Sequence, residues 1–172
     1  MMSDAAGLDI EFTECTHGQR WFGSTEESER LETMSRVGNT IFDAVRESDD
    51  VLVYVESDLL WDAHTIGSLI DMAVRRDGDF DVFAPMVMAG EHFYDIWAFR
   101  KGGERFGPFK PFAVLNDGLT EIDSAGSCLV MRASIARECR IENGNCLVGW
   151  CDGVRARGLK IAVHSGMRID HP

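Results

Sequence analysis

The fold of this chain is decided by residues 51–62, which read VLVYVESDLLWD. The β-branched and aromatic run Val51–Val55 predicts a buried strand, and Asp62 is placed to cap a following helix. Glu56 and Asp58 come directly after the strand. Because alternate residues of an extended chain point the same way, both carboxylates can reach one hard cation. The alternative is that Asp58 is an ordinary turn residue.

On either side of this stretch, the hydrophobic pattern alternates between strand and helix periods. Before it, residues 8–13 predict a half-buried strand and residues 26–48 a helix. After it come a helix from Asp62 and a strand over residues 80–85, and this strand-helix-strand unit predicts parallel pairing. The remaining predicted elements are a strand over 127–132, helices over 133–139 and 147–157, and a strand over 159–164, with an irregular, glycine-rich stretch over 89–116. We therefore predict one α/β domain over residues 1–172, with a mostly parallel central sheet flanked by helices.

Composition narrows the classes of partner. The chain has 172 residues, 45% of them hydrophobic and 27% charged, which is typical of a globular protein with a proper core. A formal net charge of -12 disfavours nucleic acid and anionic lipid as partners. The five cysteines are Cys15, Cys128, Cys139, Cys146 and Cys151, and their spacing favours free, buried thiols. With no signal-like or membrane-spanning run in the sequence, we expect a cytoplasmic protein without a transmembrane segment.

Several separated segments resemble one family, the GT-A-type nucleotide-sugar glycosyltransferases, especially its family-two-like and mannosyltransferase-like branches. The run Val51–Asp58 is similar to the family's strand leading to an Asp-x-Asp metal motif, here Glu56-Ser57-Asp58. The resemblance makes Asp58 the more direct metal ligand. Glu56, one methylene longer, would bind the metal through water or contact the sugar or ribose.

The most specific match is residues 81–100, where a strand ending in Pro85 is followed by FYDIWAFR. It resembles the family's pattern Tyr-Asp-x-Trp-x-x-Arg, carried here by Tyr94, Asp95, Trp97 and Arg100. Flat aromatic faces suit the apolar side of a sugar ring, a carboxylate suits its hydroxyls, and an arginine suits a phosphate. The alternative is that the aromatic residues belong to the core.

Two later segments resemble the acceptor side of the family's cleft. Residues 123–132 carry Gly126, which permits close backbone approach to a ligand, and Asp123, either a base, a sugar-hydroxyl acceptor or a turn residue. Residues 149–161 resemble the family's acidic helix, but the family's Glu-Asp pair is replaced by Leu147-Val148-Gly149. Asp152 is the nearest carboxylate on that helix, so Asp152 and Asp123 are the candidate bases.

The chain ends in residues 167–172, similar to a strand whose terminal histidine completes the family's metal shell. His171 would join Asp58 and Glu56, and its imidazole favours Mn²⁺ over Mg²⁺. Family members usually begin with a strand-helix-strand unit that binds the nucleotide base, of which this chain shows only residues 8–13. The resemblance thus implies an N-terminally shortened, Rossmann-like GT-A domain.

The activity implied by the resemblance is metal-dependent transfer of a hexosyl, possibly mannosyl, group. The donor would be a GDP- or UDP-sugar, and the acceptor a glycan or another hydroxyl compound. Two alternatives stay open: a catalytically degenerate sugar-binding or partner subunit, with a homo-oligomer or a second subunit completing it, and, with less support, a nucleotidyltransferase. The sequence leaves the sugar, the linkage and the stereochemistry open.

Overall fold

The computed structural model describes residues 14, 21–24, 26–105, 118–142 and 144–172. The helices are α1 (Ser28–Asp43), α2 (Ala63–Arg75), α3 (Ala133–Glu138) and α4 (Cys146–Ala156), with a short 3-10 helix, η1 (Asp77–Asp79). The strands are β1 (Val51–Val55), β2 (Val82–Ala89), β3 (His92–Phe93), β4 (Arg100–Lys101), β5 (Glu104–Arg105), β6 (Leu119–Ile122), β7 (Cys128–Arg132) and β8 (Ile161–Asp170). The strand predicted over 8–13 lies outside the described residues.

The main sheet is mixed, in the order β1-β7-β2-β8-β6, with β3 beside β2. Among the described strands only β2 and β8 pair in parallel, and every other pairing is antiparallel. The prediction of a mostly parallel sheet is therefore wrong. The strands β1 and β2 do run in the same direction, but β7 lies between them and is antiparallel to both. The periodicity of each strand predicts the strand itself and cannot show which segment is inserted beside it.

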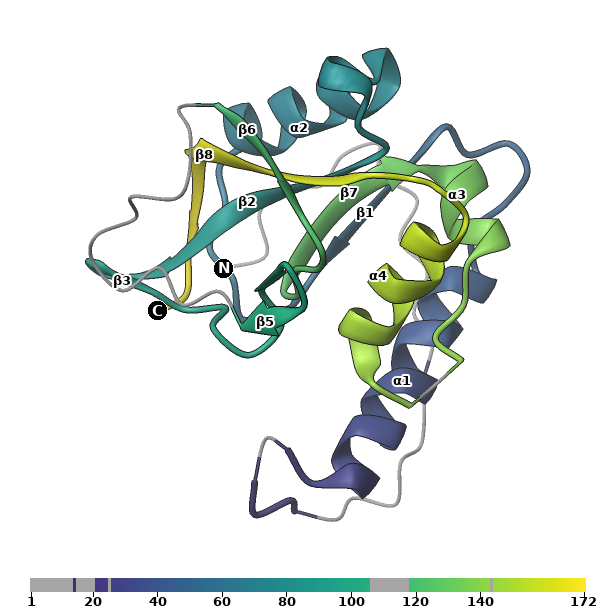
Figure 1. Ribbon diagram of the computed structural model, residues 1–172, viewed down its shortest axis with the longest axis vertical. Coiled ribbons are helices and arrows are strands. Elements are labelled where there is room, and N and C mark those ends of the chain that lie inside the picture. Colours follow the sequence, from purple (N-terminus) through teal and green to yellow (C-terminus); the bar gives the residue numbers. More distant parts are fainter. Residues whose placement is uncertain (1–13, 15–20, 25, 106–117, 143) are drawn as a thin grey trace.

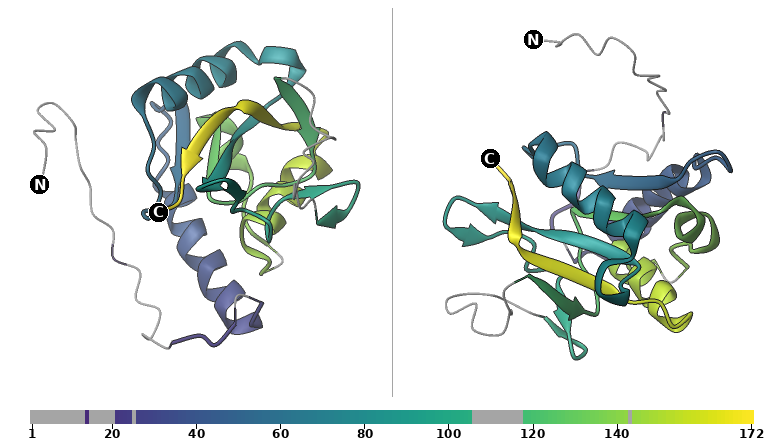
Figure 2. Two further views of the ribbon diagram at one scale, coloured as in Figure 1. Left: turned by 90° about the vertical axis from the view of Figure 1, so that its left-hand side faces the viewer. Right: turned by 90° about the horizontal axis from the view of Figure 1, so that it is seen from above.

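Both faces of the sheet are covered by helices. On one face, Phe83 of β2 and Val130 of β7 pack with Leu69 and Ala73 of α2. On the other face lies the larger core, where Phe42 of α1 stacks on Trp150 of α4 at 5.3 Å between ring centroids. Figure 1 and Figure 2 show α2 on one side of the sheet and the adjacent α1 and α4 on the other. The alternation of β2 and β7 residues between these cores explains why β2 is apolar throughout and β7 is apolar up to Arg132.

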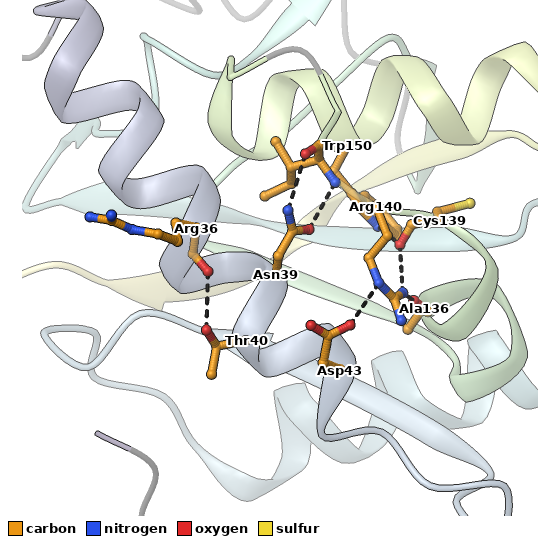
Figure 3. Close-up of polar contacts among 9 residues, drawn as sticks. Arg36, Asn39, Thr40, Asp43, Ala136, Cys139, Arg140 and Trp150 are labelled. Atoms are coloured by element: carbon orange, nitrogen blue, oxygen red, sulfur yellow. Dashed lines mark hydrogen bonds and ion pairs between the residues drawn. The ribbon is translucent and has the colours of Figure 1, made fainter. Parts of the chain in front are cut away.

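Helix α1 is held in place through its middle. The helix predicted over 26–48 is confirmed, but it ends at Asp43. Asn39 donates to the Ile141 carbonyl (3.1 Å) and accepts from the Ile141 amide (2.9 Å), as Figure 3 shows. A Cβ at Gly38 would lie 2.9 Å from Cδ1 of Ile141, so glycine lets this loop approach closely. These contacts offset the low helix propensity of the Gly38-Asn39 pair.

Two further local predictions are confirmed. Asp62 caps α2, with its carboxylate accepting from the Thr65 amide (2.8 Å) and from the Thr65 hydroxyl (2.7 Å). The four cysteines within the described residues are all free and buried. The final strand is longer than predicted, since β8 continues through Gly166 to Asp170. That extension carries the end of the chain back toward the turn after β1.

Candidate functional site

The first part of the candidate site is the turn that follows β1. The Glu56 amide donates to the Ser127 carbonyl (2.9 Å), and the Leu59 amide donates to the Glu56 carbonyl (3.3 Å). Leu59 is buried in a small core with residues of α2 and β8. Glu56 is half-buried, whereas the Asp58 side chain is 56% exposed. The backbone thus fixes this turn while leaving the Asp58 carboxylate accessible.

The second part is the end of β8. Asp170 and Leu60 exchange both backbone hydrogen bonds, at 2.7 and 2.9 Å, and the His171 amide donates to the Met88 carbonyl (2.7 Å). These bonds bring Nε2 of His171 to 3.4 Å from Oδ2 of Asp58. The structure therefore joins two residues that the sequence separates by almost two thirds of the chain.

Tyr94 completes this corner of the molecule. Its ring stacks on the His171 imidazole with centroids 3.8 Å apart and planes within 15°. The Tyr94 amide donates to the Val87 carbonyl (2.8 Å), which anchors the residue beside β2. Stacking fixes the plane of the imidazole, so Nε2 keeps its direction toward Asp58. We call Asp58, Tyr94 and His171 the Asp58 corner.

Two side chains of the Asp58 corner, Asp58 and His171, are placed so that both could bind one divalent cation. A cation bonded at about 2.0–2.2 Å to both Asp58 Oδ2 and His171 Nε2 is compatible with their separation of 3.4 Å. Among the described residues, no group of three or more His, Cys, Asp or Glu side chains is placed to hold a metal ion, and Glu56 stays a predicted ligand. Burial raises the pKa of Glu56, the Ser127 hydroxyl opposes that rise and the charge of Asp58 adds to it. Two protein ligands leave coordination positions for water and for a substrate.

Beside the Asp58 corner lies a cavity of about 610 Å³. Its lining comes from the start of α1, the turn after β1, the segment after β3, β5, the turn before β7 and the start of α4. The lining residues are Glu26, Arg30, Met34, Glu56, Tyr94, Asp95, Ile96, Trp97, Ala98, Arg105, Gly126, Ser127, Cys146 and Leu147. Of the predicted sugar-binding residues, Glu56, Tyr94, Asp95, Trp97 and Gly126 meet here, whereas Asp58 and Arg100 are not part of the lining.

Asp95 is the most deeply buried acid of this cavity. It is 7% exposed, and its Oδ2 accepts a hydrogen bond of 2.7 Å from the Gly126 amide. Burial raises the pKa of Asp95 to about 7, while the Gly126 hydrogen bond opposes the rise and Glu56 adds to it. A Cβ at Gly126 would lie 2.7 Å from the Cβ of Ala98 and 3.0 Å from Oδ1 of Asp95. The close approach predicted for Gly126 is thus made by the chain's own Asp95–Ala98 turn.

The turn between Gly126 and β7 also contains a strained residue that the sequence did not single out. Ser127 has φ of 37°, in the left-handed region that non-glycine residues seldom adopt. Its carbonyl accepts from the Glu56 amide, and its hydroxyl bonds to the Glu56 side chain. Ser127 therefore positions Glu56 at the cavity wall.

Arg100 does not point a free guanidinium at the cavity. It donates to the Trp97 carbonyl and, at 3.2 Å, to the Phe99 carbonyl, and it lies over the Trp97 ring at 5.7 Å. Burial lowers the pKa of Arg100, and the nearby charge of Arg105 lowers it further. Arg100 therefore supports the Trp97 turn, and its contact with a phosphate stays a prediction.

Arg105 and Glu26 form a feature that sequence reasoning missed. Both line the cavity and they form an ion pair, with side chains 53% and 54% exposed. Arg105, through a hydrogen bond and its charge, lowers the pKa of Glu26, and the Trp97 indole contributes to the same effect. Arg30 and Met34 lie four residues apart on one face of α1, and Glu26 precedes that helix. No local pattern pointed to Arg105.

The two candidate bases lie elsewhere. Asp123 pairs with Arg155 at 3.0 Å and accepts from the Gly103 amide at 2.6 Å. Asp152 lies 3.9 Å from the same guanidinium and is 52% exposed. We call Asp123, Asp152 and Arg155 the Asp123 corner. The structure brings these two carboxylates near each other but not into the lining of the cavity.

Comparison with known proteins adds no family or relative. No family model matches the chain, and no curated protein matches it at a significant level. Within the described part of the chain, no helix is long and apolar enough to cross a membrane. The function of the protein is therefore inferred from the geometry of the Asp58 corner and of the cavity.

Proposed function

We propose that the protein is a metal-dependent glycosyltransferase that moves a sugar from a nucleoside-diphosphate sugar to a hydroxyl acceptor. The observation that carries this proposal is the convergence of Asp58 and His171 within 3.4 Å at the edge of a cavity lined by Tyr94, Asp95 and Trp97. We propose with it that the mixed sheet and its helices form a GT-A-like domain. It is supported by the acidic turn after β1 and the histidine after β8.

In this mechanism Asp58 and His171 would hold a Mn²⁺ or Mg²⁺ ion. When bound, such a cation supplies positive charge to the departing diphosphate. Tyr94 orients the imidazole by stacking, and the backbone bonds of Leu60, Met88 and Asp170 keep His171 in place. The role of this corner is therefore to hold two ligands rigidly beside the cavity.

The cavity would hold the donor sugar. A volume of about 610 Å³ lies within the range of about 300–1,000 Å³ common for small-molecule sites. Trp97 and Tyr94 offer aromatic faces to a sugar ring, and Asp95 offers a carboxyl oxygen to its hydroxyls. With a pKa of about 7, Asp95 exchanges a proton near neutral pH and can accept or donate such a hydrogen bond.

The direct test is Mn²⁺-dependent turnover of GDP- and UDP-sugars by the full chain and by Asp58→Ala. We expect the variant to lose at least about 100-fold in turnover, because one of two metal ligands is removed. Asp71→Asn is the matched control, since it removes an exposed carboxylate from α2, on the other side of the sheet. Turnover that survives Asp58→Ala, or binding of neither nucleotide sugar by the full chain, would contradict the proposal.

A second candidate function is sugar binding without transfer. It is favoured by one observation: Asp123 and Asp152, the candidate bases, lie beside Arg155 and do not line the cavity. This alternative expects the full chain to bind a glycan or a partner subunit while releasing no nucleoside diphosphate. Measuring glycan binding and diphosphate release on the same sample separates the two functions.

A further inference from the structure

The Arg105–Glu26 pair connects two parts of the chain that are held independently. Glu26 precedes α1, the helix that Asn39 fastens to the loop before α4. Arg105 ends the β4–β5 hairpin. The pair joins these two elements at the wall of the cavity, because both residues belong to its lining.

The hairpin that carries Arg105 is anchored through its backbone. The Gly103 amide donates to Asp123 (2.6 Å), and the Lys101 ammonium donates to the Glu121 carbonyl (2.9 Å). Arg100 exchanges backbone hydrogen bonds with Ser124 (3.1 Å) and Asp123 (2.8 Å). The Arg105 side chain can therefore turn between Glu26 and a ligand without moving the hairpin.

Two further arginines lie near Arg105, in a cavity whose lining also carries the acids Glu26, Glu56 and Asp95. Arg100 lies close enough for its pKa to be lowered by Arg105, and Arg30 lines the same cavity. Guanidinium groups are suited to diphosphate oxygens because their donors form a planar fork. Glu26 presents a carboxylate to that fork now, in the position a phosphate would take.

We propose that Arg105 is a diphosphate-binding residue of this cavity, and that Glu26 occupies its guanidinium until a ligand's diphosphate displaces the carboxylate. The identity of the ligand rests on the proposed function, since the donor there is a nucleoside-diphosphate sugar. The displacement is feasible because both partners are half exposed, and ion pairs of that kind are weak. Glu26 thus sets the affinity for the diphosphate and disfavours uncharged ligands at Arg105.

The test is a titration of inorganic pyrophosphate, UDP and GDP in EDTA, which separates Arg105 from any cation at Asp58. Glu26→Gln is expected to bind pyrophosphate about two- to fivefold more tightly than the native chain, because the competing charge is gone. Arg105→Gln is expected to bind about tenfold more weakly or worse, because a charge-assisted contact is lost. The nucleotide titrations show whether the diphosphate is recognised alone or as part of a nucleotide.

Glu104→Gln is the matched control. It removes the same charge from the neighbouring position of β5, where the side chain is exposed, and is expected to change the affinity less than Glu26→Gln. The double variant Glu26→Gln/Arg105→Gln is expected to match Arg105→Gln, since Glu26 acts through Arg105.

Equal gains from Glu26→Gln and Glu104→Gln would overturn the inference. So would a gain that persists without Arg105, or a lack of pyrophosphate binding by both the native chain and Glu26→Gln. Failure of the proposed function has a different signature, because loss of Mn²⁺-dependent transfer leaves the metal-free coupling between Glu26 and Arg105 intact.

Discussion

The Asp58 corner and the Asp123 corner both collect carboxylates from distant segments, but they treat the charge differently. At the Asp58 corner the only ion pair described for Asp58 is with a histidine, and its carboxylate is mainly exposed. At the Asp123 corner an arginine lies 3.0 Å from Asp123, which is only 16% exposed. A carboxylate that must bind a cation or take a proton has to be available, and one that already neutralises an arginine holds structure instead. By this criterion, the availability of the carboxylate favours the Asp58 corner over the Asp123 corner as a functional site.

The sharpest test of this contrast is to remove the organising partner on each side. We expect His171→Ala to weaken Mn²⁺ binding by about 100-fold, because one of the two predicted ligands that lie 3.4 Å apart is removed. Arg155→Ala is expected to leave Mn²⁺ affinity unchanged. Isothermal titration with Mn²⁺ measures both, and equal losses in the two variants would erase the distinction between the corners.

Gly126→Ala tests how closely the cavity wall is packed. The added methyl would lie 2.7 Å from the Cβ of Ala98, so we expect a loss of about 1–3 kcal/mol in the free energy of unfolding. Gly67→Ala in α2 is the control, because no other atom lies within 4 Å of its added Cβ, and it is expected to be neutral or stabilising. Urea denaturation compares them, and an unaffected Gly126→Ala would show that the Asp95–Ala98 turn yields easily.

Asp95→Asn tests whether the buried Asp95 carboxyl makes the stability of the protein depend on pH. The pKa of Asp95 is about 7 in the folded state and 3.8 as its ordinary value, so the folded state binds the proton more tightly. The contribution of Asp95 to stability is therefore greatest below about pH 4 and is lost as the pH rises from about 4 to 7. We expect Asp95→Asn to reduce the change in the free energy of unfolding between pH 4 and pH 7 by about 1–2 kcal/mol. This is less than the full pKa shift of Asp95 would give, because water that enters the cavity screens the charge. Unfolding curves recorded from pH 4 to 8 measure it, and an unchanged slope would place the ionisation elsewhere.

The sequence predicted the Asp58 corner better than the sheet that builds it. Asp58 was singled out because it follows a strand with a clear apolar pattern, and His171 because the end of the chain resembles the family's strand that ends in a histidine. The insertion of β7 between β1 and β2 was missed, because a pairing partner leaves no mark on the periodicity of either strand.

Side-chain pairs across the chain were missed for a related reason. The Glu26–Arg105 and Asp123–Arg155 pairs join residues whose local surroundings give no signal of the partner. Gly126 was predicted to let a ligand approach the backbone closely. What approaches it is the Asp95–Ala98 turn, which only the three-dimensional arrangement reveals.

The smallest expected effect compares the two acids of the Asp123 corner. Asp123→Asn is expected to cost about 1 kcal/mol of stability, because it weakens both the Gly103 hydrogen bond and the Arg155 pair. Asp152→Asn is expected to cost less than about 0.5 kcal/mol, since Asp152 is exposed and its nitrogen partner is 3.9 Å away. Turnover of a nucleotide sugar should stay within about twofold for both, whereas loss of a general base would cost about 10²–10⁴-fold. A loss of that size in either variant would show that the acid beside Arg155 acts on the acceptor. The Asp123 corner, and not the Asp58 corner, would then be the better candidate for the catalytic site.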